Sequence, residues 1–312
     1  MRKRSNGLLL LLLVLAAFTC SCKKKLEFPL VQKYNTRPGD VFFFRPRDGQ
    51  FVLVERSKAL AVAIAAEPDI RAYAYDDKIT VARPDEGGGG WLHNTPFIEK
   101  LGAQQALAIT PDGRFLAGGD AKGTVTIWNV VTADVTLHLD MAGSIRCLAF
   151  SPDGNWLAIG LASPAGEPSD TVWVYEIHAN GPHRSFGRTA ISALAWSPDG
   201  HWLAAGLEDG SVLLSEAGGG SEPQRVALST SPVTALDIHP SGLFLASAHA
   251  DKRVLLAKLP TGELVHTFEP PSPNPLFPRV IECVAFDKNG ARFAIDYAEG
   301  DFRIWDTSAL SK

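Results

Sequence analysis

A short phrase whose residue types could do chemistry recurs along the chain. It reads "TPDG" at 110–113, "SPDG" at 151–154 and 197–200, and "HPSG" at 239–242. Glycine beside acidic and hydroxyl side chains could form a phosphate loop, a metal loop or a tight turn. Each copy lies between two apolar segments with strand-like alternation, whereas a phosphate loop needs a helix N-terminus after it. The phrase therefore predicts a hairpin turn.

The turn prediction assigns a physical role to each residue type. Proline fixes φ near −65°, glycine supplies the positive φ that restarts strand pairing, and Ser and Asp bond nearby backbone N–H groups. The expected turn residues are Pro111, Gly113, Pro152, Gly154, Pro198, Gly200, Pro240 and Gly242.

The other sequence motifs indicate no catalytic or metal-binding site. The chain has no G-x-S-x-G or H-E-x-x-H motif, and "DKNG" at 287–290 lacks the alternating acids of a calcium loop. Cys147 and Cys283 occupy the same place in two repeats and are predicted to be buried structural thiols. We therefore predict no catalytic residue, no metal ligand and no cofactor.

The elements that carry these turns repeat. Counting a weaker copy anchored on Pro68, the phrase returns at intervals of roughly 40–48 residues, a period typical of propellers and solenoids. Each unit reads as up to four short strands, and no long helical pattern follows residue 22. The fold class is therefore predicted to be all-β. An aromatic residue opens most second strands and is predicted to pack between neighbouring repeats, at Phe115, Trp156, Trp202 and Phe244.

The phrase "SPDG..LA.G", with "KGTVTIWN" at 122–129 and "EGDFRIWD" at 299–306, resembles the WD-repeat (WD40) β-propeller family. The resemblance implies four-stranded antiparallel blades closed into a ring. The family's Gly-His pair is missing from every unit, and Trp stands at the third-strand position only at Trp128 and Trp305. Packing and backbone pairing are therefore expected to hold the blades.

Closure of the ring needs one more strand. The sixth unit runs out after its third strand, and "QFVLVERS" at 50–57 offers the missing one. Residues 51–55 are therefore expected to pair with 302–305, which would cover an exposed edge. Six blades follow, with seven as the alternative.

The N-terminal segment resembles an export signal with a lipoprotein-like cleavage site. "MRKR" precedes a short apolar run at 7–18, which is followed by "TCSCKKK". Cys22 is the expected lipidation site, with Cys20 as the alternative, so the chain is expected in a bacterial cell envelope, either lipid-anchored or secreted and soluble. The expected domains are a signal peptide at 1–22, a linker with an extra strand at 23–49, and a propeller at 50–312.

The charge balance limits the partners. The chain has 30 basic and 34 acidic residues, and removal of the signal would make it more acidic. A net acidic body disfavours nucleic-acid binding, which relies on Lys and Arg. Protein partners and a membrane reached through an N-terminal lipid are expected, on a monomeric propeller.

One face of the propeller is the candidate partner-binding surface. Loops from second to third strands, and between repeats, should share this face and carry insertions at 163–170 and 269–278. The alternative is that acids there serve only as turn residues. The candidate binding residues are Asp120, Asp170, Asp209, Asp251 and Glu299, with Leu276 and Phe277 as apolar contacts.

Two functions from different classes remain. The first is a non-enzymatic protein–protein interaction scaffold. The second is a periplasmic Tol-type or hydrolase-like propeller that binds a ligand or metal in its central channel. The first strands offer mostly Ala, Leu, Ile and Val there, with Asp237 as a lone acid, which counts against a channel metal.

Overall fold

The computed structural model describes residues 30–34, 40–45, 50–56, 61–65, 70–84, 91–99, 103–162, 171–178, 181–269, 281–297 and 301–311. Strands account for all of its regular elements except a short 3₁₀ helix at Ser308–Ser311. The all-β prediction is confirmed. Within these residues, no helix has the length and apolar character needed to span a membrane.

Six antiparallel sheets have four strands each. The first sheet holds β4 (Ala61–Ala65), β5 (Ile70–Ala74), β6 (Lys78–Pro84) and β7 (Trp91–Glu99). The second holds β8 (Gln104–Ile109), β9 (Phe115–Asp120), β10 (Thr124–Asn129) and β11 (Val135–Asp140). The third holds β12 (Ile145–Phe150), β13 (Trp156–Leu161), β14 (Val172–Glu176) and β15 (Gly181–Phe186).

The remaining four-stranded sheets come from the C-terminal half of the chain, except that the sixth includes one strand from the N-terminal part. The fourth holds β16 (Ile191–Trp196), β17 (Trp202–Leu207), β18 (Ser211–Glu216) and β19 (Gln224–Ala227). The fifth holds β20 (Val233–Ile238), β21 (Phe244–His249), β22 (Val254–Lys258) and β23 (Leu264–Phe268). The sixth holds β24 (Ile281–Phe286), β25 (Arg292–Tyr297), β26 (Asp301–Asp306) and β1 (Leu30–Tyr34).

The recurring phrase forms the hairpin turn between first and second strands. In the third sheet the Ser151 hydroxyl accepts a hydrogen bond from the Trp156 N–H at 3.0 Å and donates one to Asp153 Oδ1 at 2.5 Å. Gly154 closes the turn through its N–H to the Ser151 carbonyl at 2.9 Å, with φ of 72°. Gly113, Gly200 and Gly242 have φ of 69°, 72° and 70°. The predicted turns are confirmed at all four copies.

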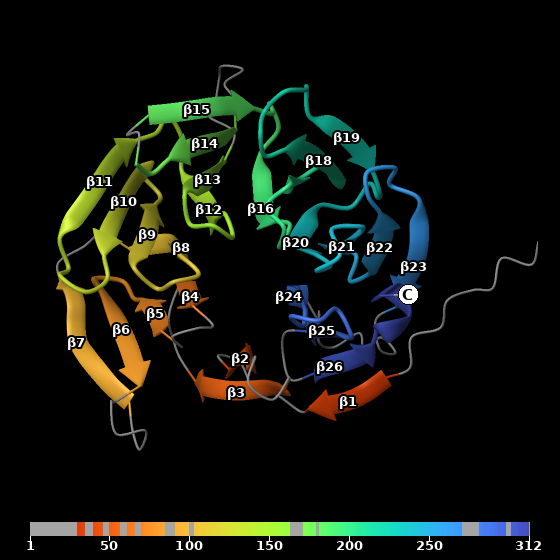
Figure 1. Cartoon of the computed structure of the whole chain (residues 1–312), viewed down its shortest axis with the longest axis horizontal. Coiled ribbons are helices and arrows are strands. Elements are labelled where there is room, and N and C mark those ends of the chain that lie inside the picture. Colours follow the sequence, from red (N-terminus) through yellow and green to blue (C-terminus); the bar gives the residue numbers. More distant parts are fainter. Residues whose placement is uncertain are drawn as a thin grey trace, which may run out of the picture.

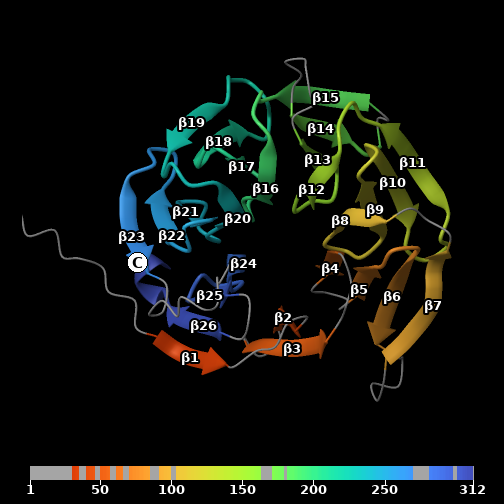
Figure 2. The same ribbon diagram turned by 180° about the vertical axis from the view of Figure 1, so that it is seen from behind.

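The apolar core lies between consecutive sheets. Val172, Phe186, Ile191 and Leu203 form one buried cluster from the third and fourth sheets, and similar clusters join other neighbouring pairs. The first strands of consecutive sheets contact one another in chain order from β4 to β24. Figures 1 and 2 show the six sheets around a common centre, with first strands innermost. Burial between neighbours stabilises the arrangement because one sheet cannot cover both its faces alone.

The strand that completes the sixth sheet differs from the expected one. β1 pairs antiparallel with β26, with Tyr34 opposite Phe302 and Leu30 opposite Trp305. The predicted pairing of 51–55 with 302–305 is wrong, because β3 (Gln50–Arg56) pairs with β2 (Asp40–Arg45) in a two-stranded sheet. In the sequence β3 begins five positions after β2 ends, and closing so short a segment costs less chain entropy than reaching a distant strand. Figure 1 shows this sheet between β1 and β4.

Candidate functional site

The described candidate acids lie in turns between second and third strands, as expected. Asp120 Oδ1 accepts hydrogen bonds from the N–H groups of Lys122 and Thr124, both at 2.9 Å. This geometry is that of an Asx turn, in which the carboxylate replaces a backbone carbonyl. Asp120 therefore shapes its own turn, whatever else it contacts.

Two further acids combine turn capping with an ion pair. Asp209 Oδ1 accepts the Ser211 N–H at 3.0 Å, and its Oδ2 pairs with the Arg225 guanidinium. Asp251 Oδ1 accepts the Arg253 N–H at 3.2 Å, and its Oδ2 accepts from Arg253 Nε at 2.9 Å. Partial burial works against ionisation of both groups, but these bonds outweigh it and hold both pKa values below their usual range. Both side chains are anionic at neutral pH.

The remaining candidate residues fall outside the described part of the chain. These are Asp170, Leu276, Phe277 and Glu299 on the expected binding face, and Cys20 and Cys22 at the expected lipidation site. Partner binding at the acidic turns stays a prediction.

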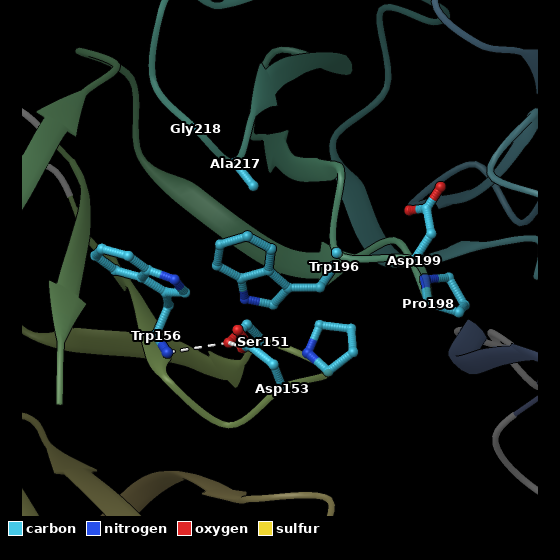
Figure 3. A pocket seen from close by; sticks show the side chains of 10 residues that line it. Ser151, Asp153, Trp156, Trp196, Pro198, Asp199, Ala217 and Gly218 are labelled. Atoms are coloured by element: carbon cyan, nitrogen blue, oxygen red, sulfur yellow. Dashed lines mark hydrogen bonds between the residues drawn. The ribbon is translucent and has the colours of Figure 1, made fainter. Parts of the chain in front are cut away.

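The opposite face carries a cavity of about 610 Å³ between the third and fourth sheets. Antiparallel topology places the first-to-second and third-to-fourth connections at this end of every sheet. The lining residues come from those connections and from the strand ends beside them: Ser151, Pro152, Asp153, Trp156, Trp196, Pro198, Asp199, Gly200, Ala217 and Gly218. Figure 3 shows two indole rings, Trp156 and Trp196, projecting into one space with Ala217 beyond them. We call this space the indole cavity.

Four segments of the chain match the WD40 family model, described as WD domain, G-beta repeat, at residues 102–129, 135–163, 180–214 and 222–256. These four segments are similar to WD40 repeats. The sheet architecture and these matches together support a WD40-like propeller. A search of the curated proteins found no match.

A small residue opens the indole cavity within the WD40-like repeats. The residue just after the third strand donates its N–H to the neighbouring hairpin turn at 2.8–2.9 Å in five sheets. In four of these the side chain is buried, as Val130, Ile177, Leu259 and Thr307. In the fourth sheet the residue is Ala217, which is only half-buried. The missing side-chain volume leaves the space between Trp156 and Trp196 unfilled.

The two indoles differ in exposure. Trp196 is 8% exposed, and its Nε1–H donates to the Ala149 carbonyl of the third sheet at 3.0 Å. Trp156 is half-buried, which agrees with its predicted place between repeats. Sequence reasoning missed the cavity itself. The detectable signal in the sequence was Ala217, because the other repeats have a larger residue at the equivalent position. The three glycines that follow Ala217 add no side chain that could fill the space.

A second cavity of about 500 Å³ lies among the ends of the first strands. Its lining is apolar as predicted, with Asp237 as the only acid among the described lining residues. Asp237 Oδ2 accepts the Phe286 N–H of the sixth sheet at 2.6 Å, and Oδ1 accepts the Ile238 N–H at 2.9 Å. Burial of the carboxyl raises its pKa to about 7, although the residue keeps partial exposure to the cavity. Asp237 therefore links β20 to β24.

The two thiols are not equivalent. Cys147 packs against the cluster that contains Ile191 of the following sheet, and burial raises the pKa of its thiol to about 12. Cys283 is exposed, so the prediction of a buried thiol is wrong there. Cys283 lies on β24, at one edge of its four-stranded sheet. Across the described residues, no three His, Cys, Asp or Glu side chains form a group that could hold a metal ion.

Proposed function

We propose that this chain is a non-enzymatic scaffold that docks protein partners on the face bearing its acidic turns. The observation that carries the proposal is the set of four WD40-like segments, because WD40 repeats generally mediate protein–protein interaction. The described acids support it by presenting fixed carboxylates on one face. Fold alone does not establish function, so the face itself must be tested.

The ring is part of the same proposal. We infer that six four-stranded blades close around a central channel. The two-stranded β2–β3 sheet would lie between the sixth blade and the first blade. The chain-order contacts of first strands and the strand pairing of β1 with β26 support closure. A closed ring would hold the acidic turns at fixed mutual distances, which a docking face requires.

The docking face is tested by charge removal that keeps the turns intact. We expect Asp120→Asn, Asp209→Asn and Asp251→Asn together to reduce partner recovery several-fold in cross-linking from the native envelope. Asparagine keeps the Oδ1 acceptor that shapes each turn, so the main change is the loss of charge. The readout is the amount of each attached protein, quantified by mass spectrometry.

A double variant on the opposite face controls for the loss of negative charge outside the acidic turns. Asp112 and Asp134 are exposed and lie in connections at the other end of the second sheet. Asp112→Asn with Asp134→Asn should leave partner recovery unchanged. If this control loses partners while the triple variant keeps them, the acidic turns are not the docking face.

We further propose that the scaffold is exported and held in a bacterial envelope by a lipid on Cys22, with Cys20 as the alternative. The motif at 7–25 supports this proposal. The intact mass of the mature protein should equal a chain beginning at the acylated cysteine. Cys22→Ser should release the protein into the soluble fraction, and an unmodified N-terminus after another residue would contradict anchoring.

A channel ligand is the second candidate function, since Asp237 faces the cavity among the first strands. Both of its oxygens already accept backbone N–H groups, which favours a role in joining sheets. Metal content of the purified chain and a hydrolase screen separate the two functions. A stoichiometric metal that Asp237→Ala removes would establish the channel as a binding site.

A further inference from the structure

The indole cavity has a built-in negative charge. Asp153 lies beneath the two indoles in Figure 3, and Asp199 lies at the rim beyond Trp196. Burial opposes ionisation of Asp153, but the hydrogen bonds from Ser151 and Asn155 together outweigh it and hold its pKa below the usual range. The Ser197 hydroxyl does the same for the pKa of Asp199. Both carboxylates are therefore ionised at neutral pH.

The described lining residues supply no cation to that charge. Of the described residues that line the cavity, none is basic. The carboxylates on the opposite face differ in this respect, because Asp209 and Asp251 each pair with an arginine of this chain. The described lining thus combines two carboxylates with two indole side chains.

We propose that the indole cavity binds an arginine side chain of a protein partner. A guanidinium is planar, stacks on indole faces and bonds to carboxylate oxygens, so it matches both features of the lining. Asp153 supplies the anion, and Trp156 supplies the more accessible aromatic face. Gly218 at the rim is exposed and has open space where a Cβ would lie, so a peptide backbone can approach.

This site does not depend on the acidic-turn face, which lies at the other end of each sheet. Removing charge from Asp120, Asp209 and Asp251 should therefore leave arginine binding unchanged. Failure of either proposal leaves the other open, because each has its own variants and its own readout.

The test uses the full chain and a labelled peptide with a central arginine flanked by Gly and Ser, followed by fluorescence anisotropy. The matched probe replaces arginine with citrulline, which keeps the shape and removes the charge. Ala217→Ile restores the side chain that Ile177 has at the equivalent position, where it is buried. We expect this substitution to weaken binding of the arginine peptide at least about tenfold, because the side chain occupies the guanidinium site.

A second pair of variants keeps the proposal testable if Ala217→Ile folds poorly. Asp153→Asn removes the central charge, and Asp112→Asn makes the same change in the equivalent turn of the second sheet, where Asp112 accepts the equivalent hydroxyl and backbone N–H hydrogen bonds. We expect about three- to tenfold weaker binding for Asp153→Asn and no change for Asp112→Asn. Thermal unfolding verifies that both fold.

Three outcomes would overturn the proposal. The first is equal affinity for the citrulline and arginine peptides, which would show that charge is not recognised. The second is unchanged arginine binding in Ala217→Ile, which would place the peptide elsewhere. The third is tighter binding of a proline-rich peptide, which would make the indoles a site for extended proline helices.

Discussion

The glycine that closes each hairpin turn has a backbone conformation that side chains rarely adopt. Gly154 has φ of 72°, and a Cβ there would meet Thr110 Cγ2 at 3.6 Å, an ordinary contact distance. Gly154→Val should therefore lower the free energy of unfolding by about 1–3 kcal/mol through backbone strain alone. Urea unfolding followed by tryptophan fluorescence measures the change.

Gly290 provides a comparison in which strain and collision act together. Its φ is 69°, but a Cβ would lie 2.0 Å from Nε2 of the buried His239 ring. His239 Nε2 also lies 3.1 Å from the Gly290 carbonyl, so the ring has little freedom to move away. Gly290→Val should cost more than Gly154→Val. Equal costs would show that the turn tolerates the collision, and no cost at Gly154 would contradict the strain argument.

Asp237 makes stability depend on pH. Its folded pKa is about 7, whereas an unfolded aspartate has a pKa near 3.9. The folded state therefore holds a proton that the unfolded state has lost, and this contribution disappears as pH rises from about 4 to about 7. Relative to Asp237→Asn, the native chain should lose about 1–3 kcal/mol of unfolding free energy between pH 4.5 and 8, since its two N–H bonds moderate the shift.

The comparison with Asp237→Asn is essential because two histidines act in the opposite direction. Burial lowers the pKa of His239 and of His249, so their contributions rise with pH. The native chain and Asp237→Asn share these histidines, so the difference between their unfolding free energies at each pH isolates the contribution of Asp237. Denaturation midpoints at several pH values provide the measurement, and parallel pH profiles for the two proteins would exclude a raised pKa.

At the scale of elements, β1 is the strand whose removal has the clearest consequence. It covers the edge of β26 along Phe302 to Trp305. Deleting residues 23–34 should lower stability and promote self-association, because an uncovered strand edge pairs with other chains. Size-exclusion chromatography and thermal unfolding check this, with deletion of residues 23–29 as the control that keeps β1.

The elements also show what the sequence can predict. The hairpins depend on local chemistry, since Pro fixes φ and Gly permits a positive φ in any context, and the four predicted turns were found. The choice of β26's partner was not local. Both 30–34 and 50–56 form strands, but 50–56 (β3) pairs with the nearby β2 and not with β26. The indole cavity arises from a missing side chain at Ala217, which becomes visible only when the sheets are packed.

At the scale of the whole molecule, closure of the proposed ring would decide how the protein unfolds. Each sheet shares its core with its neighbours, and Leu203 is fully buried between the third and fourth sheets. Leu203→Ala should lower the free energy of unfolding by about 2–5 kcal/mol. In a closed ring the loss spreads to all sheets, so fluorescence and circular dichroism should report one shared transition. Two separated transitions would indicate an open row of sheets.

The pairing of β1 with β26 also determines how the molecule responds to force. A pull on the chain ahead of Leu30 enters the fold through β1, and then through its backbone bonds to β26. These bonds run perpendicular to the strands. A force along β1 shears all of these hydrogen bonds at once and meets high resistance. A force perpendicular to β1 breaks the hydrogen bonds one after another and meets lower resistance. The direction of any tether at the N-terminus therefore sets the mechanical strength of the whole fold.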